Sequence, residues 1–234
     1  MAKRFIERAA LIAGGTGGLG LAVSLAFLNE GAKVHVTYRA AEEFSSLKKS
    51  AGEDAQLQGH RTDVTNENET DELIQSIGAI DIMVNCVGAY AGGSPLWETD
   101  VNVFDKMLDL NLRSGFILSR SVVPVMLKRH SGAIVNISSR AAFDHAAGGG
   151  AYAASKAAAL AMMDSLAADL KGSGIRVNTV LPSIIDTEAN RRAMPNADFA
   201  TWPKPEEIAA VILFLCSDEA KLIHGAAVPV YGAG

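Results

Sequence analysis

The sequence contains few cysteines, few aromatic residues and no excess of positive charge. Only two of its 234 residues are cysteines, Cys86 and Cys216, and each lies in an apolar run without a metal-ligand spacing. This usage predicts two buried free thiols in a reducing compartment and no metal site. The formal net charge of −5 argues against a broad nucleic-acid surface or an anionic membrane partner.

The amino-terminal region lacks a long hydrophobic run. Charged residues are interspersed over residues 3–8, and the short apolar run that follows ends at Gly14. Because this run is too short and too interrupted for a signal peptide or a membrane span, we expect a cytoplasmic protein. The length suits a single α/β domain over residues 1–234, and we find no internal repeat and no second domain.

Apolar runs alternate with helical patterns along the whole chain. Strands are expected at residues 9–13, 33–38, 55–61, 80–85, 132–139, 174–181 and 226–231, and helices at 21–30, 66–75, 101–128, 151–171 and 205–216. The alternation predicts one doubly wound Rossmann domain, with a mostly or wholly parallel sheet and helices on both faces. Pro124 is expected to kink the long helix.

A glycine-rich turn follows the first strand, and its residues include Gly14, Thr16, Gly18, Leu19 and Gly20. Glycines let the backbone approach a pyrophosphate closely, and the helix that follows offers free N–H groups at its positive end. The glycines are spaced G-x3-G-x-G, which differs from the commoner G-x-G-x-x-G. Between a strand and a helix, the turn predicts a dinucleotide site to which these five residues contribute.

The end of the second strand bears on the choice of cofactor. An acidic residue there would bind the ribose 2′-hydroxyl of NAD, but this chain has Tyr38 followed by Arg39. The planar guanidinium suits a 2′-phosphate, so NADP is preferred, with NAD possible. The alternative for Arg39 is a solvated loop side chain.

Three further polar residues stand out. Asp63 and Asn85 each follow an apolar run, on the side where open α/β sheets bind ligands; Asx turns are the structural alternative for both. Asn111 lies between Leu110 and Leu112 on an otherwise apolar helix, where an asparagine competes with its own backbone and needs a reason.

Tyr152, Lys156 and Ser139 form the strongest candidate for chemistry. A tyrosine and a lysine four residues apart lie on one face of a helix, and the ammonium favours the ionised phenol. A serine hydroxyl could hold a substrate oxygen against the phenol. These three groups together are suited to general acid–base catalysis on a carbonyl or alcohol. Taken alone, the pattern is more often a core tyrosine beside a solvated lysine.

Two other stretches suggest contacts with partners. The helix at 151–171 is apolar or alanine-rich nearly all round, so we expect the sheet to cover one side and a second subunit the other. The segment 182–202 is polar and without a clear period, which is typical of a lid over a substrate.

Together these motifs resemble the short-chain dehydrogenase/reductase family along essentially the whole chain. The matching motifs are Gly14-x3-Gly18-x-Gly20, Asp63-Val64, Asn85-x-x-Gly88, Asn111, Ser139, Tyr152-x3-Lys156 and Leu181-Pro182. The resemblance implies that Ser139, Tyr152 and Lys156 are catalytic and that Asn111 holds a water in a proton relay.

The resemblance also implies a set of cofactor contacts. Asp63 would contact the adenine, and Ile185 and Thr187 the nicotinamide carboxamide. The cofactor-binding set implied beyond the glycine turn and Arg39 is Asp63, Val64, Asn85, Gly88, Tyr152, Lys156, Pro182, Ile185 and Thr187. A homotetramer or homodimer packed through the two long helices is implied as well.

The sequence departs from the family pattern in places. Ser183 and Val87 stand where glycine and alanine are usual, and residues 194–199 look like dihydropteridine reductase, whose relatives lack the serine and favour NADH. Ser139 and Arg39 argue against that activity.

We therefore expect an NADP(H)-dependent oxidoreductase acting on a small carbonyl or alcohol, with Tyr152 as general acid/base. The alternatives are a pterin reductase and a non-catalytic dinucleotide-sensing module. The substrate would be defined by loops after Gly88, Ser139 and Pro182.

Overall fold

The computed structural model describes residues 3–232 and is built on one seven-stranded sheet in the order β3-β2-β1-β4-β5-β6-β7. Every neighbouring pair of strands is parallel. The strands are β1 (Ala9–Ala13), β2 (Lys33–Tyr38), β3 (Leu57–Arg61), β4 (Ile82–Asn85), β5 (Gly132–Ile137), β6 (Ile175–Pro182) and β7 (Ala227–Val230). The strand order reverses between β1 and β4, which leaves a crevice at their carboxyl ends.

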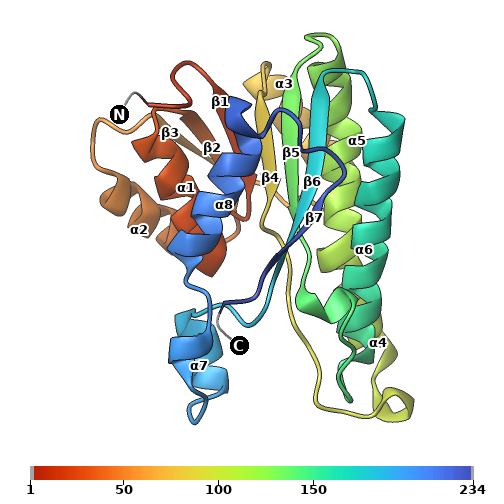
Figure 1. The fold of residues 1–234 in the computed structure, drawn as a ribbon. Coiled ribbons are helices and arrows are strands. Elements are labelled where there is room, and N and C mark those ends of the chain that lie inside the picture. Colours follow the sequence, from red (N-terminus) through yellow and green to blue (C-terminus); the bar gives the residue numbers. More distant parts are fainter. Residues whose placement is uncertain (1–2, 233–234) are drawn as a thin grey trace.

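Helices cover both faces of the sheet (Figure 1). One face carries α1 (Gly18–Asn29), α2 (Ala41–Ala51) and α8 (Pro205–Cys216), and the other carries α3 (Glu67–Ile77), α4 (Val101–Leu108), α5 (Ser114–Leu127) and α6 (Gly150–Asp169). The short α7 (Glu188–Ala193) lies beyond the carboxyl ends of the strands. The prediction of a doubly wound, wholly parallel α/β fold is confirmed.

Two hydrophobic cores lie on opposite sides of the sheet. Successive strand residues point to opposite faces, so Ile12 of β1 packs with α1 and α8 while the adjacent Leu11 packs with α3, α5 and α6. Both side chains are fully buried. The strands therefore read as continuous apolar runs, as sheets covered on both faces do.

The long helix expected at 101–128 is not continuous. A π-helical segment, Asp109–Arg113, separates α4 from α5, and it contains Asn111. The interruption between α4 and α5 lies at the segment that contains Asn111, and α5 continues through Pro124. The physical reason is the set of side-chain bonds that Asn111 makes, which are described below.

The segment 182–202 is more regular than expected, since it contains α7 and a 3-10 turn at Phe199–Thr201. Helix α7 begins where the Thr187 hydroxyl accepts a hydrogen bond from the backbone N–H of Asn190 at 3.2 Å. Because six residues are too few to show a period, the sequence pattern could not reveal this helix.

Both cysteines are free thiols; Cys216 is buried and Cys86 half-buried. Within residues 3–232 there is no cluster of three or more histidine, cysteine or acidic side chains that could hold a metal ion. In the same range, no helix combines the length and apolar character needed to cross a membrane.

Candidate active site

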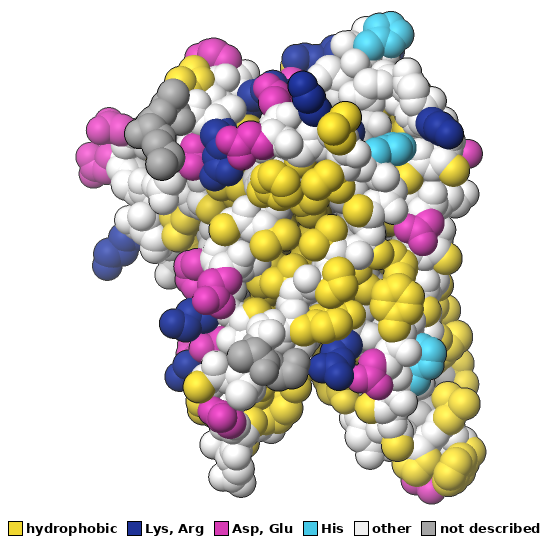
Figure 2. Space-filling model, viewed as in Figure 1, with side chains coloured by type: hydrophobic (Ala, Val, Ile, Leu, Met, Phe, Trp, Pro, Cys, Tyr) yellow, Lys and Arg dark blue, Asp and Glu magenta, His cyan; other side chains and the backbone are white. Residues whose placement is uncertain are grey.

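The candidate catalytic residues come from three elements at the carboxyl ends of the strands. Ser139 follows β5 by two residues, Tyr152 and Lys156 lie in the first two turns of α6, and Asn111 lies in the π-helical segment. The molecule is hollowed at this end, between the lobe that carries α7 and the lobe that carries α4 and the start of α6 (Figure 2).

Lys156 is a buried cation that folding places under the tyrosine. Its side chain is only 5% exposed, and its ammonium donates a hydrogen bond to the carbonyl oxygen of Ile137 at 3.0 Å. The ammonium also lies 6.0 Å from the centroid of the Tyr152 ring. Burial lowers the pKa of Lys156 to about 8, because an ammonium loses hydration inside the protein.

The pKa of the Tyr152 phenol shifts in the direction opposite to the one expected from the sequence. Lys156 was expected to lower the pKa of Tyr152, but burial raises it, and the Tyr90 phenol raises it further. The Ser139 hydroxyl opposes this shift. Desolvation therefore outweighs the hydrogen bond from Ser139, and the phenol is protonated at neutral pH.

Ser139 has its hydroxyl oxygen oriented by the backbone. That oxygen accepts a hydrogen bond from the Ala141 N–H at 3.1 Å, which caps the 3-10 turn Arg140–Ala142. The hydroxyl proton is left to donate, as required of a group that holds a carbonyl oxygen. The neighbouring Ser138 supports α6 by donating to the Lys156 carbonyl oxygen at 3.0 Å.

The Asn111 side chain fixes the loop after β4 through hydrogen bonds to its backbone. Its amide oxygen accepts from the Ala89 N–H at 2.9 Å, and its amide nitrogen donates to the Ala89 carbonyl at 3.0 Å and to Ser155 Oγ at 3.0 Å. A Cβ on Gly88 would lie 2.9 Å from Asn111 Oδ1 and 3.1 Å from Lys156 Nζ, so any larger residue there would displace one of these two side chains. The water-holding role implied for Asn111 stays a prediction.

The glycine turn after β1 fits a dinucleotide pyrophosphate. Gly14 has a φ of +70°, and a Cβ on Gly20 would lie 2.0 Å from the Gly14 carbonyl oxygen, so both positions require glycine. A Cβ on Gly18 would lie 2.8 Å from Thr187 Cγ2, which places the start of α7 against the turn. No side chain caps α1, and its first turn carries no acidic residue. Its N–H groups are therefore available to an anion.

Two residues expected to bind the cofactor are paired with each other. The Arg39 guanidinium lies 2.9 Å from Asp63 Oδ2, and Asp63 Oδ1 accepts from the Thr65 N–H at 3.0 Å and the Thr65 hydroxyl at 2.7 Å. The Thr65 bonds lower the pKa of Asp63, and Arg39 adds to the effect. Asp63 therefore makes the Asx turn that was the structural alternative for it.

Other expected cofactor contacts have structural partners. Asn85 makes an Asx turn to the Val87 N–H at 3.1 Å and donates to Asn136 Oδ1 at 3.0 Å, and it is 1% exposed. Val64 is a core side chain at 4% exposure, and the Thr16 hydroxyl donates to Glu43 at 2.9 Å. The side chain of Val64 is buried, so any contact with a cofactor would come from its backbone.

The remaining expected contacts lie in α1 and in the segment after β6. Leu19 of α1 is 9% exposed, and Pro182 ends β6. Ile185 packs against the core that carries α1, and its carbonyl accepts from Thr187 N at 2.8 Å. The unusual Ser183 is accommodated because its hydroxyl donates to the Tyr231 carbonyl at 2.7 Å.

Sequence reasoning missed Tyr90. Its ring meets the Tyr152 ring edge to face, with centroids 5.0 Å apart and an interplanar angle of 76°. The sequence placed substrate determinants in the loop after Gly88, but no motif marks Tyr90. Only the approach of the loop after β4 to the start of α6 in three dimensions reveals the contact.

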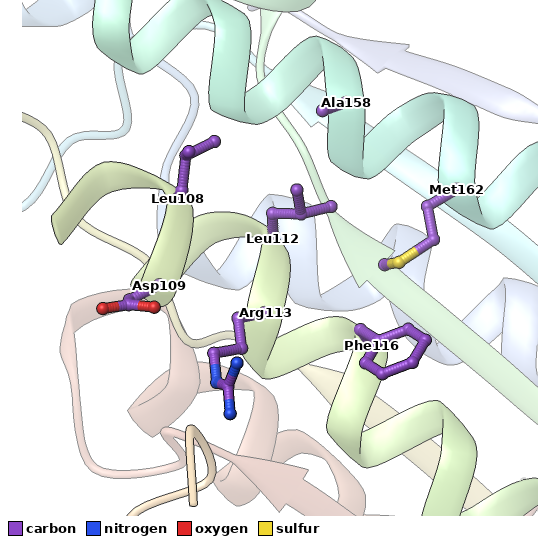
Figure 3. Close-up of a pocket in the computed structure, with 7 residues that line it drawn as sticks. All are labelled: Leu108, Asp109, Leu112, Arg113, Phe116, Ala158 and Met162. Carbon is purple, nitrogen blue, oxygen red and sulfur yellow. The ribbon is translucent and has the colours of Figure 1, made fainter. Parts of the chain in front are cut away.

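A hollow of about 420 Å³ lies elsewhere, between the helices α4–α5 and α6. Leu112, Phe116 and Met162 point into the gap between the two helices (Figure 3). None of the four candidate catalytic residues lines it; the residues that do are Leu108, Asp109, Leu112, Arg113, Phe116, Ala158 and Met162.

The parallel sheet, the glycine turn and the half-buried Tyr152 beside the buried Lys156 define a Rossmann-type oxidoreductase domain. Comparison with known proteins makes the assignment specific, because the short chain dehydrogenase family matches residues 8–198. The chain belongs to this family, whose members are NAD(P)-dependent enzymes acting on CH–OH and C=O groups.

The similar proteins cover nearly the whole chain. The chain is 33% identical to the 3-oxoacyl-acyl-carrier-protein reductase of Thermotoga maritima, over 98% of both chains. The structure of a short-chain type dehydrogenase/reductase from Mycobacterium ulcerans superposes with a TM-score of 0.92, at 25% identity, over 98% of this chain and 90% of that one. The NADP-bound structure of ElxO gives 0.89 at 27% identity, over 97% and 98%. These relatives do not favour a pterin reductase.

Proposed function

We propose that this protein is an NADP(H)-dependent carbonyl reductase, or an alcohol dehydrogenase in reverse, with Tyr152 as the proton-transfer group. The observation that carries the proposal is the buried Lys156 ammonium 6.0 Å from the centroid of the Tyr152 ring, with the Ser139 hydroxyl acting on the same phenol. A buried lysine is costly because its ammonium loses hydration, and lysines with a strongly shifted pKa cluster at functional sites.

The chain's own residues handle the substrate oxygen and its proton. A bound nicotinamide supplies or accepts the hydride. In reduction, Ser139 donates a hydrogen bond to the carbonyl oxygen, and Tyr152 gives that oxygen its proton. The raised pKa of Tyr152 suits this direction, because the phenol is protonated at neutral pH. Lys156 holds positive charge beside the phenol when the proton leaves.

Arg39 supports the choice of NADP. Its side chain is 73% exposed at the carboxyl end of β2, and its ion pair with Asp63 is partly exposed as well. Exposed ion pairs contribute only about 0–1 kcal/mol, so a 2′-phosphate can engage the guanidinium at little cost. The ElxO structure, which holds NADP, shows that the family fold accepts this cofactor.

A second copy of the chain is proposed to cover the outer face of α5 and α6. Phe116 is 54% exposed there, beside the hollow shown in Figure 3. Burying such an apolar side chain in a homodimer or homotetramer removes its surface from water, which is favourable. The free thiols suit a cytoplasmic location.

Tyr152→Phe tests the proposed function. The variant keeps the ring but cannot transfer a proton, so turnover of ketones with NADPH is expected to fall about 10²–10⁴-fold. The affinity for NADPH, measured by nucleotide fluorescence, is expected to stay unchanged. The assay uses a panel of ketones and aldehydes with NADPH and with NADH.

Tyr231→Phe is the matched control, because Arg140 packs over the Tyr231 ring at 5.3 Å and the substitution keeps that ring. We expect Tyr231→Phe to turn over substrate like the natural protein. Near-normal turnover by Tyr152→Phe with any substrate would exclude the proposed mechanism.

A further inference from the structure

Tyr90 is a large aromatic side chain that folding leaves exposed beside the candidate active site. It lies in the loop between β4 and α4 and is 68% exposed. Its ring meets Tyr152 edge to face at 5.0 Å. This geometry is one of the two favoured for a pair of aromatic rings, since the positive edge of one meets the negative face of the other.

The backbone around Tyr90 is anchored on both sides. Asn111 holds Ala89, the preceding residue, through both its N–H at 2.9 Å and its carbonyl at 3.0 Å. Three residues after Tyr90, the Gly93 N–H donates to the Gly148 carbonyl at 3.0 Å, which ties the loop to the segment that leads into α6. The position of Tyr90 is therefore set by two other elements of the site.

The Tyr90 side chain folds back over its own loop. A Cβ on Gly92 would lie 2.5 Å from the Tyr90 hydroxyl oxygen, so glycine at that position makes room for the phenol. The Tyr90 hydroxyl therefore lies over Gly92 while one side of the ring contacts the Tyr152 ring, and the rest of the side chain is exposed.

We propose that Tyr90 is a positioning residue whose ring holds the Tyr152 phenol in the orientation needed for proton transfer. The proposal rests on the proposed function of Tyr152. Proton transfer depends steeply on geometry, because the phenol must lie within hydrogen-bond reach of the substrate oxygen. The Tyr90 phenol also raises the pKa of Tyr152, which is consistent with two hydroxyl-bearing rings in contact.

The test replaces the ring while keeping an apolar side chain. In Tyr90→Leu we expect kcat for ketone reduction to fall about 10-fold or more, with KM changed much less and with unchanged NADPH affinity. Tyr90→Phe retains the ring and is expected to restore most of kcat. Because Tyr90 is exposed, both variants are expected to fold, which thermal unfolding checks.

Trp97→Ala is the matched control, because Trp97 is an aromatic of the same loop and is 85% exposed. We expect it to keep the natural kcat. A normal kcat in Tyr90→Leu would overturn the proposal, as would an equal loss in Trp97→Ala or a loss in Tyr90→Phe as deep as in Tyr90→Leu.

Tyr152→Phe in the same panel separates failure of this proposal from failure of the proposed function. Full activity in Tyr152→Phe would overturn both. Loss of activity in Tyr152→Phe together with full activity in Tyr90→Leu would overturn only the role of Tyr90.

Discussion

At the scale of single residues, Lys156 shows that the candidate active site contains a charged group whose burial lowers the stability of the fold. The ammonium is almost fully buried, and its hydrogen-bond partner, the Ile137 carbonyl, is neutral. Desolvation costs stability, which appears as the lowered pKa of about 8. A lysine with a solvated ammonium would not incur this cost, but it would also place no charge beneath the phenol.

The proposed preference for NADPH over NADH can be tested at Arg39. We expect Arg39→Ala to raise the Kd for NADPH about 10–100-fold, because a charge-assisted hydrogen bond to phosphate contributes about 1.5–3 kcal/mol. The Kd for NADH is expected to change little. Nucleotide fluorescence titration with both cofactors measures the difference.

The control for Arg39 is Arg120→Ala. Arg120 is likewise an exposed arginine, 52% exposed and paired with Glu67, but on helix α5. We expect it to leave both affinities unchanged. Equal weakening of NADPH and NADH binding by Arg39→Ala would show that the guanidinium does not distinguish the 2′-phosphate.

At the scale of the element, the π-helical segment explains why the polar Asn111 lies in an otherwise apolar helical stretch, which the sequence pattern alone could not explain. Asn111 is 2% exposed and fixes Ala89 and Ser155, so its polar groups are satisfied by a loop and by α6. A buried amide is tolerated only when it is hydrogen-bonded. The local change of helical geometry therefore lies where these long-range bonds are made.

Strands β2 and β3 carry a histidine pair that makes stability depend on pH. His35 Nδ1 lies 3.1 Å from His60 Nε2, and the rings stack. Burial lowers the pKa of both rings, and His60 lowers that of His35 further. The unfolded chain therefore binds more protons than the folded chain just below the ordinary histidine pKa of 6.5.

We expect the free energy of unfolding to fall as the pH drops from about 6.5 towards the lowered pKa values, since the neutral pair must then be protonated. Urea unfolding at pH 7.5 and pH 5.5 measures this loss. In His60→Gln, which keeps a hydrogen-bonding side chain, the loss is expected to be smaller.

His145→Gln serves as the comparison, because His145 is exposed in the loop before α6. It is expected to keep the pH dependence of the natural protein. If His60→Gln lost as much stability on acidification as the natural protein, the histidine pair would not be the cause.

At the scale of the whole molecule, the exposed apolar side chains on α5 and α6 predict self-association. Phe116→Glu places a carboxylate on the proposed interface, and burying an unpaired charge costs about 3 kcal/mol or more. We expect the dissociation constant of the oligomer to rise at least about 100-fold. Size-exclusion chromatography with light scattering measures the change in mass.

Ile6→Glu is the control, because Ile6 is 62% exposed and lies close to Gly31, which follows α1 on the face of the sheet opposite to α5. We expect it to keep the natural mass. A Phe116→Glu protein with unchanged mass and a natural unfolding temperature would exclude this face as the subunit interface.

Much of the architecture follows from local patterns in the sequence. Strands buried on both faces are continuous apolar runs, and several helices carry a local start or stop signal, such as Gly31 after α1 and Pro205 at the start of α8, so much of the parallel sheet could be predicted element by element. The glycine turn and the Tyr152–Lys156 spacing are also local. A tyrosine and a lysine four residues apart share a helix face whatever surrounds them.

Only the tertiary structure decided how these parts meet. The burial of Lys156 against Ile137, the pairing of Arg39 with Asp63 and the contact of Tyr90 with Tyr152 each join segments that are distant in the sequence. The upward shift in the Tyr152 pKa has the same origin, because desolvation depends on everything packed around the phenol. The hydrophobic periodicity of a sequence indicates which face of a helix or strand is buried. The partners of a side chain and its pKa depend on neighbours from distant segments, which no local pattern specifies.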